Sequence, residues 1–242
     1  MNTGTTTFKQ IQAAARSTAA KTGRAVPTQE YLTRHVLESF LDRLTRTPHA
    51  EDFVLKGGIL LAAYGVRRPT KDVDANAVTA EVSTAHLSTV VRDIAAVDAP
   101  DGVVFDVDTI TVQEIREQAD YPGYRVRVKA AIGPWQGVAA WDVSTGDPIV
   151  PAPRPVRVGR VLGEPIELLG YAPETAIAEK GVTILERGIT STRWRDYIDI
   201  VQLARHGVDT DEILRSAHLA GYGNVGQAKW AAWRRKEGLD MI

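Results

Sequence analysis

The stretch at residues 53–77, FVLKGGILLAAYGVRRPTKDVDANA, places the strongest constraint on how this 242-residue chain folds. The predicted elements are a strand over 53–55, a helix over 59–64 and a second strand with two carboxylates. Gly57 and Gly58 are expected to form the turn that starts the helix, and Asp72 and Asp74 are expected on the second strand. Because side chains alternate along a strand, both carboxylates are expected on one face.

The chemistry expected of this stretch is that of a nucleoside triphosphate site. Glycines at the start of a helix let backbone N–H groups approach an anion closely. Two converging carboxylates repel each other unless a cation lies between them, and oxygen ligands suit Mg²⁺. Lys56 and Arg67 are the basic residues expected to bind the phosphates. Each half of the pattern alone is common in turns and strand edges, but their order together favours an active site.

A second pair of carboxylates, Asp106 and Asp108, competes with Asp72 and Asp74 for a metal ion. It lies on a strand predicted over 103–111. No glycine-rich helix start precedes it, so nothing nearby would hold a triphosphate. We therefore expect this second pair to lie on a solvated strand face.

Composition excludes several classes of protein. The chain has no cysteine, which excludes disulfides and thiolate metal sites. Its longest apolar stretch is too short to span a bilayer and no signal peptide is evident, so we expect a cytoplasmic protein with no membrane association. Residues 1–50 hold seven Lys/Arg against three Asp/Glu, whereas residues 72–120 hold two against eleven. This asymmetry fits a metal-binding sheet beside elements that contact nucleic-acid phosphate.

The order of predicted elements divides the chain into three parts. Residues 1–50 contain a tail over 1–7, expected to be unstructured, and two helices that pack on the sheet. His35 lies beside the apolar stripe of the second helix and is expected to be a packing or surface residue. Residues 51–150 form the catalytic α/β domain. Residues 151–242 begin with a proline-rich connection and continue as helices.

The C-terminal part holds a second set of candidate site residues. Lys180 is predicted to face inward on a helix, where a lysine needs an anion such as a triphosphate, although it could also pair with neighbours or reach water. Asp196 and Asp199 share one face of the next helix, an arrangement that also occurs in ordinary surface networks. Trp230 and Trp233 precede a basic run and could stack on RNA or belong to a core.

The Gly-Gly turn followed by Asp-x-Asp resembles the first motif of the DNA polymerase β-like nucleotidyltransferases. Several segments are more closely similar to the AbiEii-type toxins of type IV toxin–antitoxin systems. These are 55–58, the pair Arg67-Arg68, 70–74, Ala139–Asp147 and the helices that carry Lys180 and Asp196. The resemblance implies an α/β fold with a mixed sheet, N-terminal helices and a helical C-terminal domain that completes the NTP site.

The resemblance also implies a set of roles and partners. Mg²⁺ (or Mn²⁺) would be held by Asp72, Asp74 and a third carboxylate from a later strand, Asp142. The remaining implied site residues are the catalytic Lys180 and Asp196. The substrate would be an NTP and the acceptor the 3′ end of tRNA, with a block of translation and growth as the result.

The implied regulation is a cognate antitoxin, a kinase-like protein that phosphorylates Thr70. Two alternatives stay open. One is nucleotide transfer to a protein or small-molecule hydroxyl, and the other is a non-catalytic binding protein with the same fold.

Overall fold

The computed structural model describes residues 3–25, 27–66, 68–79, 82–115, 123–187 and 194–219. These residues form two compact units. The first comprises Met1–Ala63, Arg67–Gly146 and Pro155–Leu169, and the second comprises Tyr64–Val66, Asp147–Arg154 and Gly170–Ile242. The three-part division expected at residues 50 and 150 stays a prediction.

Two helices open the first unit, α1 (Thr3–Thr22) and α2 (Thr28–Leu44). The expectation of an unstructured tail over 1–7 is wrong from Thr3 onward. The first turn of α1 packs against backbone, because a Cβ atom at Gly4 would lie 2.8 Å from the amide nitrogen of Gly133. A glycine therefore lets the helix begin against the turn after β4, a contact between segments far apart in the sequence.

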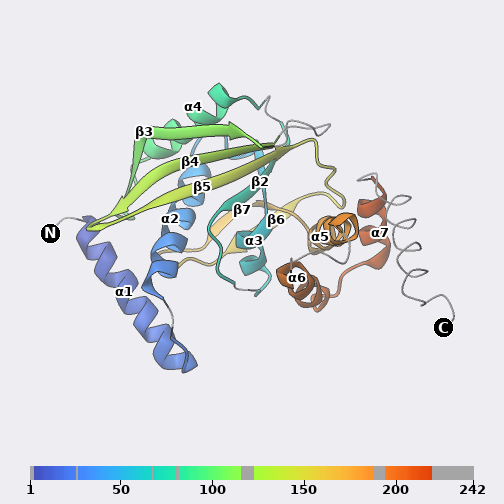
Figure 1. Ribbon diagram of the computed structural model, residues 1–242, viewed down its shortest axis with the longest axis horizontal. Helices are drawn as coiled ribbons and strands as arrows, with labels where there is room; N and C mark the ends of the chain where they lie inside the picture. The colour runs from blue at the N-terminus through green and yellow to red at the C-terminus, as the bar shows by residue number, and fades with distance from the viewer. Residues whose placement is uncertain are drawn as a thin grey trace. The chain divides into compact units, whose positions relative to one another are not determined.

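A mixed seven-stranded sheet forms the centre of the first unit, in the order β3-β4-β5-β2-β1-β7-β6 (Figure 1). Its strands are β1 (Phe53–Lys56), β2 (Val73–Ala77), β3 (Val103–Glu114), β4 (Gly123–Ile132), β5 (Trp135–Thr145), β6 (Arg154–Val158) and β7 (Ile166–Gly170). Strand β2 pairs antiparallel with β1 and parallel with β5. The central position of β2 places its side chains between those of two neighbouring strands.

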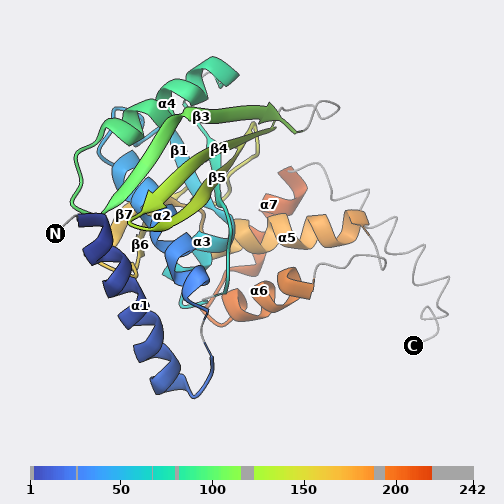
Figure 2. The same ribbon diagram turned by 60° about the vertical axis from the view of Figure 1, so that its left-hand side comes forward.

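Helix α2 covers one face of the sheet, and Figure 1 shows it behind strands β4 and β5. Its Phe40 lies 5.5 Å from Trp141 of β5, ring centroid to centroid, and Trp141 lies 4.7 Å from Phe53 of β1. Helix α4 (Thr84–Ala96) contacts α2 and runs along β3 (Figure 2). Because side chains alternate along β5, Asp142 faces away from this aromatic core.

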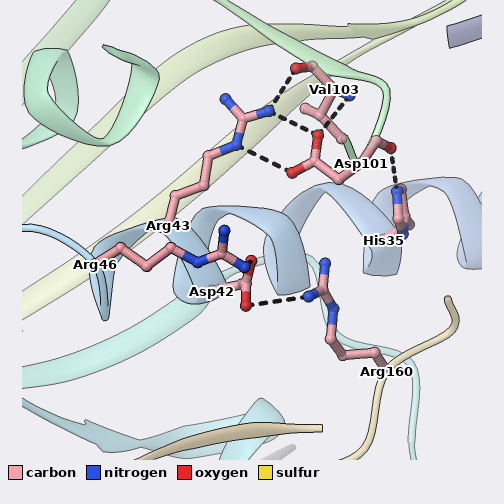
Figure 3. A network of polar contacts seen from close by, with 7 residues as sticks. All are labelled: His35, Asp42, Arg43, Arg46, Asp101, Val103 and Arg160. Carbon is pink, nitrogen blue, oxygen red and sulfur yellow. Dashed lines mark hydrogen bonds and ion pairs between the residues drawn. The ribbon is translucent and has the colours of Figure 1, made fainter. Parts of the chain in front are cut away.

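A polar network ties α2 to the loop that enters β3 (Figure 3). Arg43 donates two hydrogen bonds to the carboxylate of Asp101, at 3.0 and 2.7 Å, and a third to the carbonyl oxygen of Val103. The Nε2 atom of His35 donates to the carbonyl oxygen of Asp101 at 2.9 Å. His35 is 1% exposed, and burial lowers its pKa, so the expectation of a packing histidine is confirmed.

The second unit is helical. It contains α5 (Pro173–Arg187), α6 (Trp194–Ala204) and α7 (Thr210–Leu219), and α5 contacts both of the others. The helices expected from the sequence are confirmed here to within about one residue at most ends. The helix expected over 225–236, with Trp230 and Trp233, lies outside the described residues. None of the described helices has the length and apolar character that crossing a membrane requires.

Candidate active site

The glycine turn connects β1 to α3 (Gly57–Ala63), and both glycines are needed for space. Gly57 has a φ of 66°, a backbone conformation that side-chain-bearing residues rarely adopt. A Cβ atom there would lie 1.9 Å from Oδ2 of Asp74, and one at Gly58 would lie 2.7 Å from the hydroxyl of Thr70. The turn therefore lets a carboxylate and a hydroxyl approach the start of α3.

A row of four charged side chains crosses the sheet at this point. Lys56 of β1 lies opposite Asp74 of β2 in the antiparallel register. Asp74 in turn lies opposite Asp142 of β5, and Asp142 lies opposite Arg125 of β4. Directly opposite residues share a face of the sheet, with Cβ atoms about 5 Å apart. The row therefore runs in the order cation, carboxylate, carboxylate, cation.

Burial and like charge act together on Asp74. They raise the pKa of its carboxyl from 3.8 to about 6, with burial the largest cause and the charges of Asp72 and Asp142 adding to it. Lys56 and the backbone N–H of Gly58, 3.4 Å from Oδ2, act in the opposite direction. A carboxyl in this position is stabilised as an anion when a further cation approaches it.

Asp72 lies immediately before β2, on the same face as Asp74 by the two-residue period. Its carboxylate accepts a hydrogen bond from the hydroxyl of Thr70, at 3.2 Å. Thr70 also contacts the backbone oxygen of Asp72, at 3.3 Å, so the loop before β2 holds the carboxylate in place. The residues predicted as ligands for a divalent ion are thus close together, and their oxygen-only chemistry fits Mg²⁺ or Mn²⁺.

Asp142 has a partner that sequence reasoning did not assign to it. Arg125 binds both of its oxygens, one at 2.8 Å, and this contact is the largest cause of a raised pKa at Arg125. An oxygen that accepts one hydrogen bond keeps a second lone pair, so a bidentate arginine does not exclude metal binding. The basic row on the predicted strand indicated Arg125, but only the register of β4 against β5 identifies its partner.

A cavity of about 390 Å³ in the first unit adjoins the glycine turn, a volume in the usual range for small-ligand sites. Gly58 and Thr70 form part of its wall. The rest comes from α1, α2, the remainder of α3, the loop before β2 and β6. The other charged or polar residues of the wall are Thr18, Glu30, Tyr31, Arg34, Glu38 and Arg68.

The second unit brings Lys180, Asp196 and Asp199 together. The ammonium of Lys180 on α5 lies 2.8 Å from Asp196 and 2.9 Å from Asp199, both on α6. The two carboxylates are 5% and 1% exposed in their side chains, so this is a buried ion cluster. Lys180 was expected either to bind an anion, to pair with neighbouring side chains or to reach water. The contacts that the structure describes are ion pairs with neighbouring carboxylates. Arg67 lies outside the described residues.

Comparison with known proteins decides the family. A family model described as "Nucleotidyl transferase AbiEii toxin, Type IV TA system" matches residues 39–236, most of the chain. The chain belongs to this family. The match contains both charged clusters, the one on the sheet and the one in the helical unit. No curated relative matches the chain significantly.

A solved structure shares the fold of this AbiEii family member. A putative nucleotidyltransferase from Helicobacter pylori is similar at 18% identity and a TM-score of 0.52, over 84% of this chain and 81% of that one. JHP933 from Helicobacter pylori is similar at 19% identity and a TM-score of 0.49. That match covers 73% of this chain and 66% of JHP933, just under two thirds of its length. The expected α/β nucleotidyltransferase fold with a mixed sheet is confirmed.

Proposed function

We propose that this AbiEii family member transfers a nucleoside monophosphate from an NTP to the 3′ end of tRNA, and that this transfer blocks translation and growth. The observation that supports it best is the crowding of Asp72, Asp74 and Asp142 at the glycine turn. Burial first, and then the charges of Asp72 and Asp142, raise the pKa of Asp74. A divalent ion such as Mg²⁺, brought with a triphosphate, would supply positive charge that favours the ionised carboxylates.

The contacts support the proposed roles. Asp72 and Asp74 would hold the divalent ion, and Asp142, oriented by Arg125, would be the third carboxylate. The ion, when bound, neutralises the triphosphate and makes the attacking hydroxyl more acidic. Gly57 and Gly58 leave room for phosphate oxygens beside the carboxylates, and Lys56 balances the charge of Asp74.

The reaction that these residues would support is an in-line displacement. The 3′-oxygen of the RNA attacks the α-phosphorus, the bond from that phosphorus to the bridging oxygen breaks, and pyrophosphate leaves. The proton of the 3′-hydroxyl passes to a carboxylate of the cluster.

Lys180 and Asp196 have proposed roles in NTP binding. Asp196 accepts a hydrogen bond from the ammonium of Lys180, Asp199 forms an ion pair with it, and these two contacts hold the ammonium in place. Lys180→Ala should lose transfer while divalent-ion binding persists, and Lys180→Arg should rescue poorly because a planar fork does not replace a point charge. Full activity of Lys180→Ala would assign the phosphate to Arg67 or Lys71.

Incubation of the purified protein with total RNA, Mg²⁺ and each labelled NTP tests the proposal. We expect label on RNA of tRNA size, with none in the Asp72→Ala variant. Activity and RNA binding should fall steeply with salt if the basic N-terminal segment contacts phosphates. Label on a protein band and never on RNA would favour the alternative acceptor, and no transfer to any acceptor would favour a non-catalytic binding protein.

Thr70 is the proposed point of control by a kinase-like antitoxin. Its hydroxyl donates a hydrogen bond to the carboxylate of Asp72 and lies beside Gly58. A phosphate on this hydroxyl would add roughly two negative charges at the carboxylate cluster. NTP binding should then fail without unfolding. Thr70→Glu is expected to abolish transfer, whereas Thr70→Ser, which keeps the hydroxyl, should retain it. Wild-type transfer by Thr70→Glu would contradict this control.

A further inference from the structure

A group of histidine and aspartate side chains lies in the first unit, separate from the carboxylate row. His49 and Asp52 belong to the connection between α2 and β1, and His86 lies in the first turn of α4. The ligand atoms that these three residues offer all lie within 4.8 Å of one another. Helix α4 contacts α2, which places the two segments side by side.

Within this His49–Asp52–His86 cluster, the contact between His49 and Asp52 has the spacing of neighbouring ligands in a coordination shell. His49 Nδ1 lies 3.4 Å from Oδ2 of Asp52. With metal–ligand bonds of about 2.0–2.2 Å, neighbouring ligands of a tetrahedral ion are separated by roughly that distance. The rings of His49 and His86 lie edge to face, with centroids 5.5 Å apart. Small side-chain shifts would bring all three atoms onto one ion.

The ring nitrogen Nε2 of His86 supports a ligand role. It is buried and has no hydrogen-bond partner. A buried polar atom without a partner is costly, and the great majority of such atoms in folded proteins are satisfied. A metal ion bound to the lone pair of Nε2 would remove this cost.

The surroundings fix the other two ligands in orientation. His49 Nε2 lies 3.0 Å from Oδ2 of Asp93, a contact that leaves Nδ1 as the lone-pair nitrogen facing Asp52. Histidine ligands of metals usually donate their second N–H to a carboxylate in this way. The other oxygen of Asp52 accepts from the hydroxyl of Thr79, which directs Oδ2 toward His49.

We propose that the His49–Asp52–His86 cluster binds Zn²⁺, with Asp93 as the carboxylate that orients His49. Two imidazoles and one carboxylate suit Zn²⁺ better than Mg²⁺, which prefers oxygen ligands throughout. Three protein ligands leave a fourth position for water or for a group from a partner. The ion joins the connection after α2 to the first turn of α4. This site does not depend on the proposed nucleotide transfer.

Titration of Zn²⁺ into tag-free, metal-stripped full-length protein tests the site. To remove the other carboxylate cluster, the titration is done in an Asp72→Ala/Asp74→Ala background. We expect one Zn²⁺ per chain by calorimetry, a rise in the unfolding temperature, and tetrahedral d–d bands with Co²⁺. Asp93→Asn should weaken binding by about 10- to 100-fold, and His86→Ala should weaken it further.

The matched control is His218→Ala, which removes an exposed histidine on α7. It should bind Zn²⁺ as the parent does. Circular dichroism checks that each variant folds, and His86→Gln, which keeps more of the side-chain volume, replaces His86→Ala if that variant does not. Equal Zn²⁺ affinity in the parent, His86 and Asp93 variants would overturn the proposal. With Asp72 and Asp74 restored, His86→Ala should keep NTP transfer, so the two proposals fail separately.

Discussion

The same tripeptide, Asp-Val-Asp, occurs at 72–74 and at 106–108, and the two copies have opposite surroundings. Asp74 lies on central strand β2 between Lys56 and Asp142, and its pKa is raised. Asp106 and Asp108 lie on edge strand β3 and are exposed. The motif alone therefore does not mark a site. The first copy differs from the second in two ways: its strand has a neighbouring strand on each side, and a glycine turn precedes it.

The largest expected difference between the copies is in transfer activity. Asp72→Ala and Asp74→Ala should each lower it by about a thousandfold or more, because ligands of the divalent ion contribute several kcal/mol to the transition state. Asp106→Ala and Asp108→Ala should leave it unchanged. Initial rates of labelled-NTP incorporation measure both, with circular dichroism as a check of folding. Loss of activity in the second pair and not the first would reverse the assignment.

The next effect tests the glycine turn in front of the first copy. Gly57→Ala places a methyl group 1.9 Å from the Asp74 carboxylate in a left-handed backbone conformation, and should cost about 3 kcal/mol of stability. Gly65→Ala is the matched control, since its φ of 72° is similar and no atom lies within 4 Å of the added Cβ. It should cost only about 1–2 kcal/mol. Urea unfolding measures both variants, and equal losses would show that backbone strain alone accounts for Gly57.

A smaller effect concerns stability against pH. Because the pKa of Asp74 rises from 3.8 to about 6 on folding, its protonated form favours the folded state. That contribution, up to about 3 kcal/mol, is complete below pH 4 and is lost as pH rises through 6. Asp74→Asn should therefore be more stable than wild type at pH 7 by about 1–3 kcal/mol, although inactive. Both variants are measured in metal-free buffer. The stability of the control, Asp106→Asn, should stay within about 0.5 kcal/mol of wild type. A loss of stability in Asp74→Asn would contradict the raised pKa of Asp74.

Local pattern predicted the part of the site that is local in sequence. The strand, glycine turn, helix and second strand follow from apolar runs and glycines, and the two-residue period puts Asp72 and Asp74 on one face. The pairing of Arg125 with Asp142 and of Lys56 with Asp74 could not be predicted, because register between distant strands leaves no local pattern.

Other features depend on tertiary contacts in the same way. Strands β6 and β7 are short and lie in the proline-rich connection, where local pattern does not define them. The start of α1 depends on Gly4 meeting Gly133. The His49–Asp52–His86 cluster has no motif spacing, and only the packing of α4 beside α2 assembles it.

A crystal structure of the full chain with Mn²⁺ and a non-hydrolysable NTP analogue tests the proposed nucleotide site most directly. Mn²⁺ stands in for Mg²⁺ and gives an anomalous signal that locates it. We expect a peak between the carboxylates of Asp72 and Asp74, with the triphosphate beside Gly57 and Gly58. A triphosphate bound elsewhere, with Mn²⁺ at Asp106 and Asp108 or absent from Asp72 and Asp74, would contradict it.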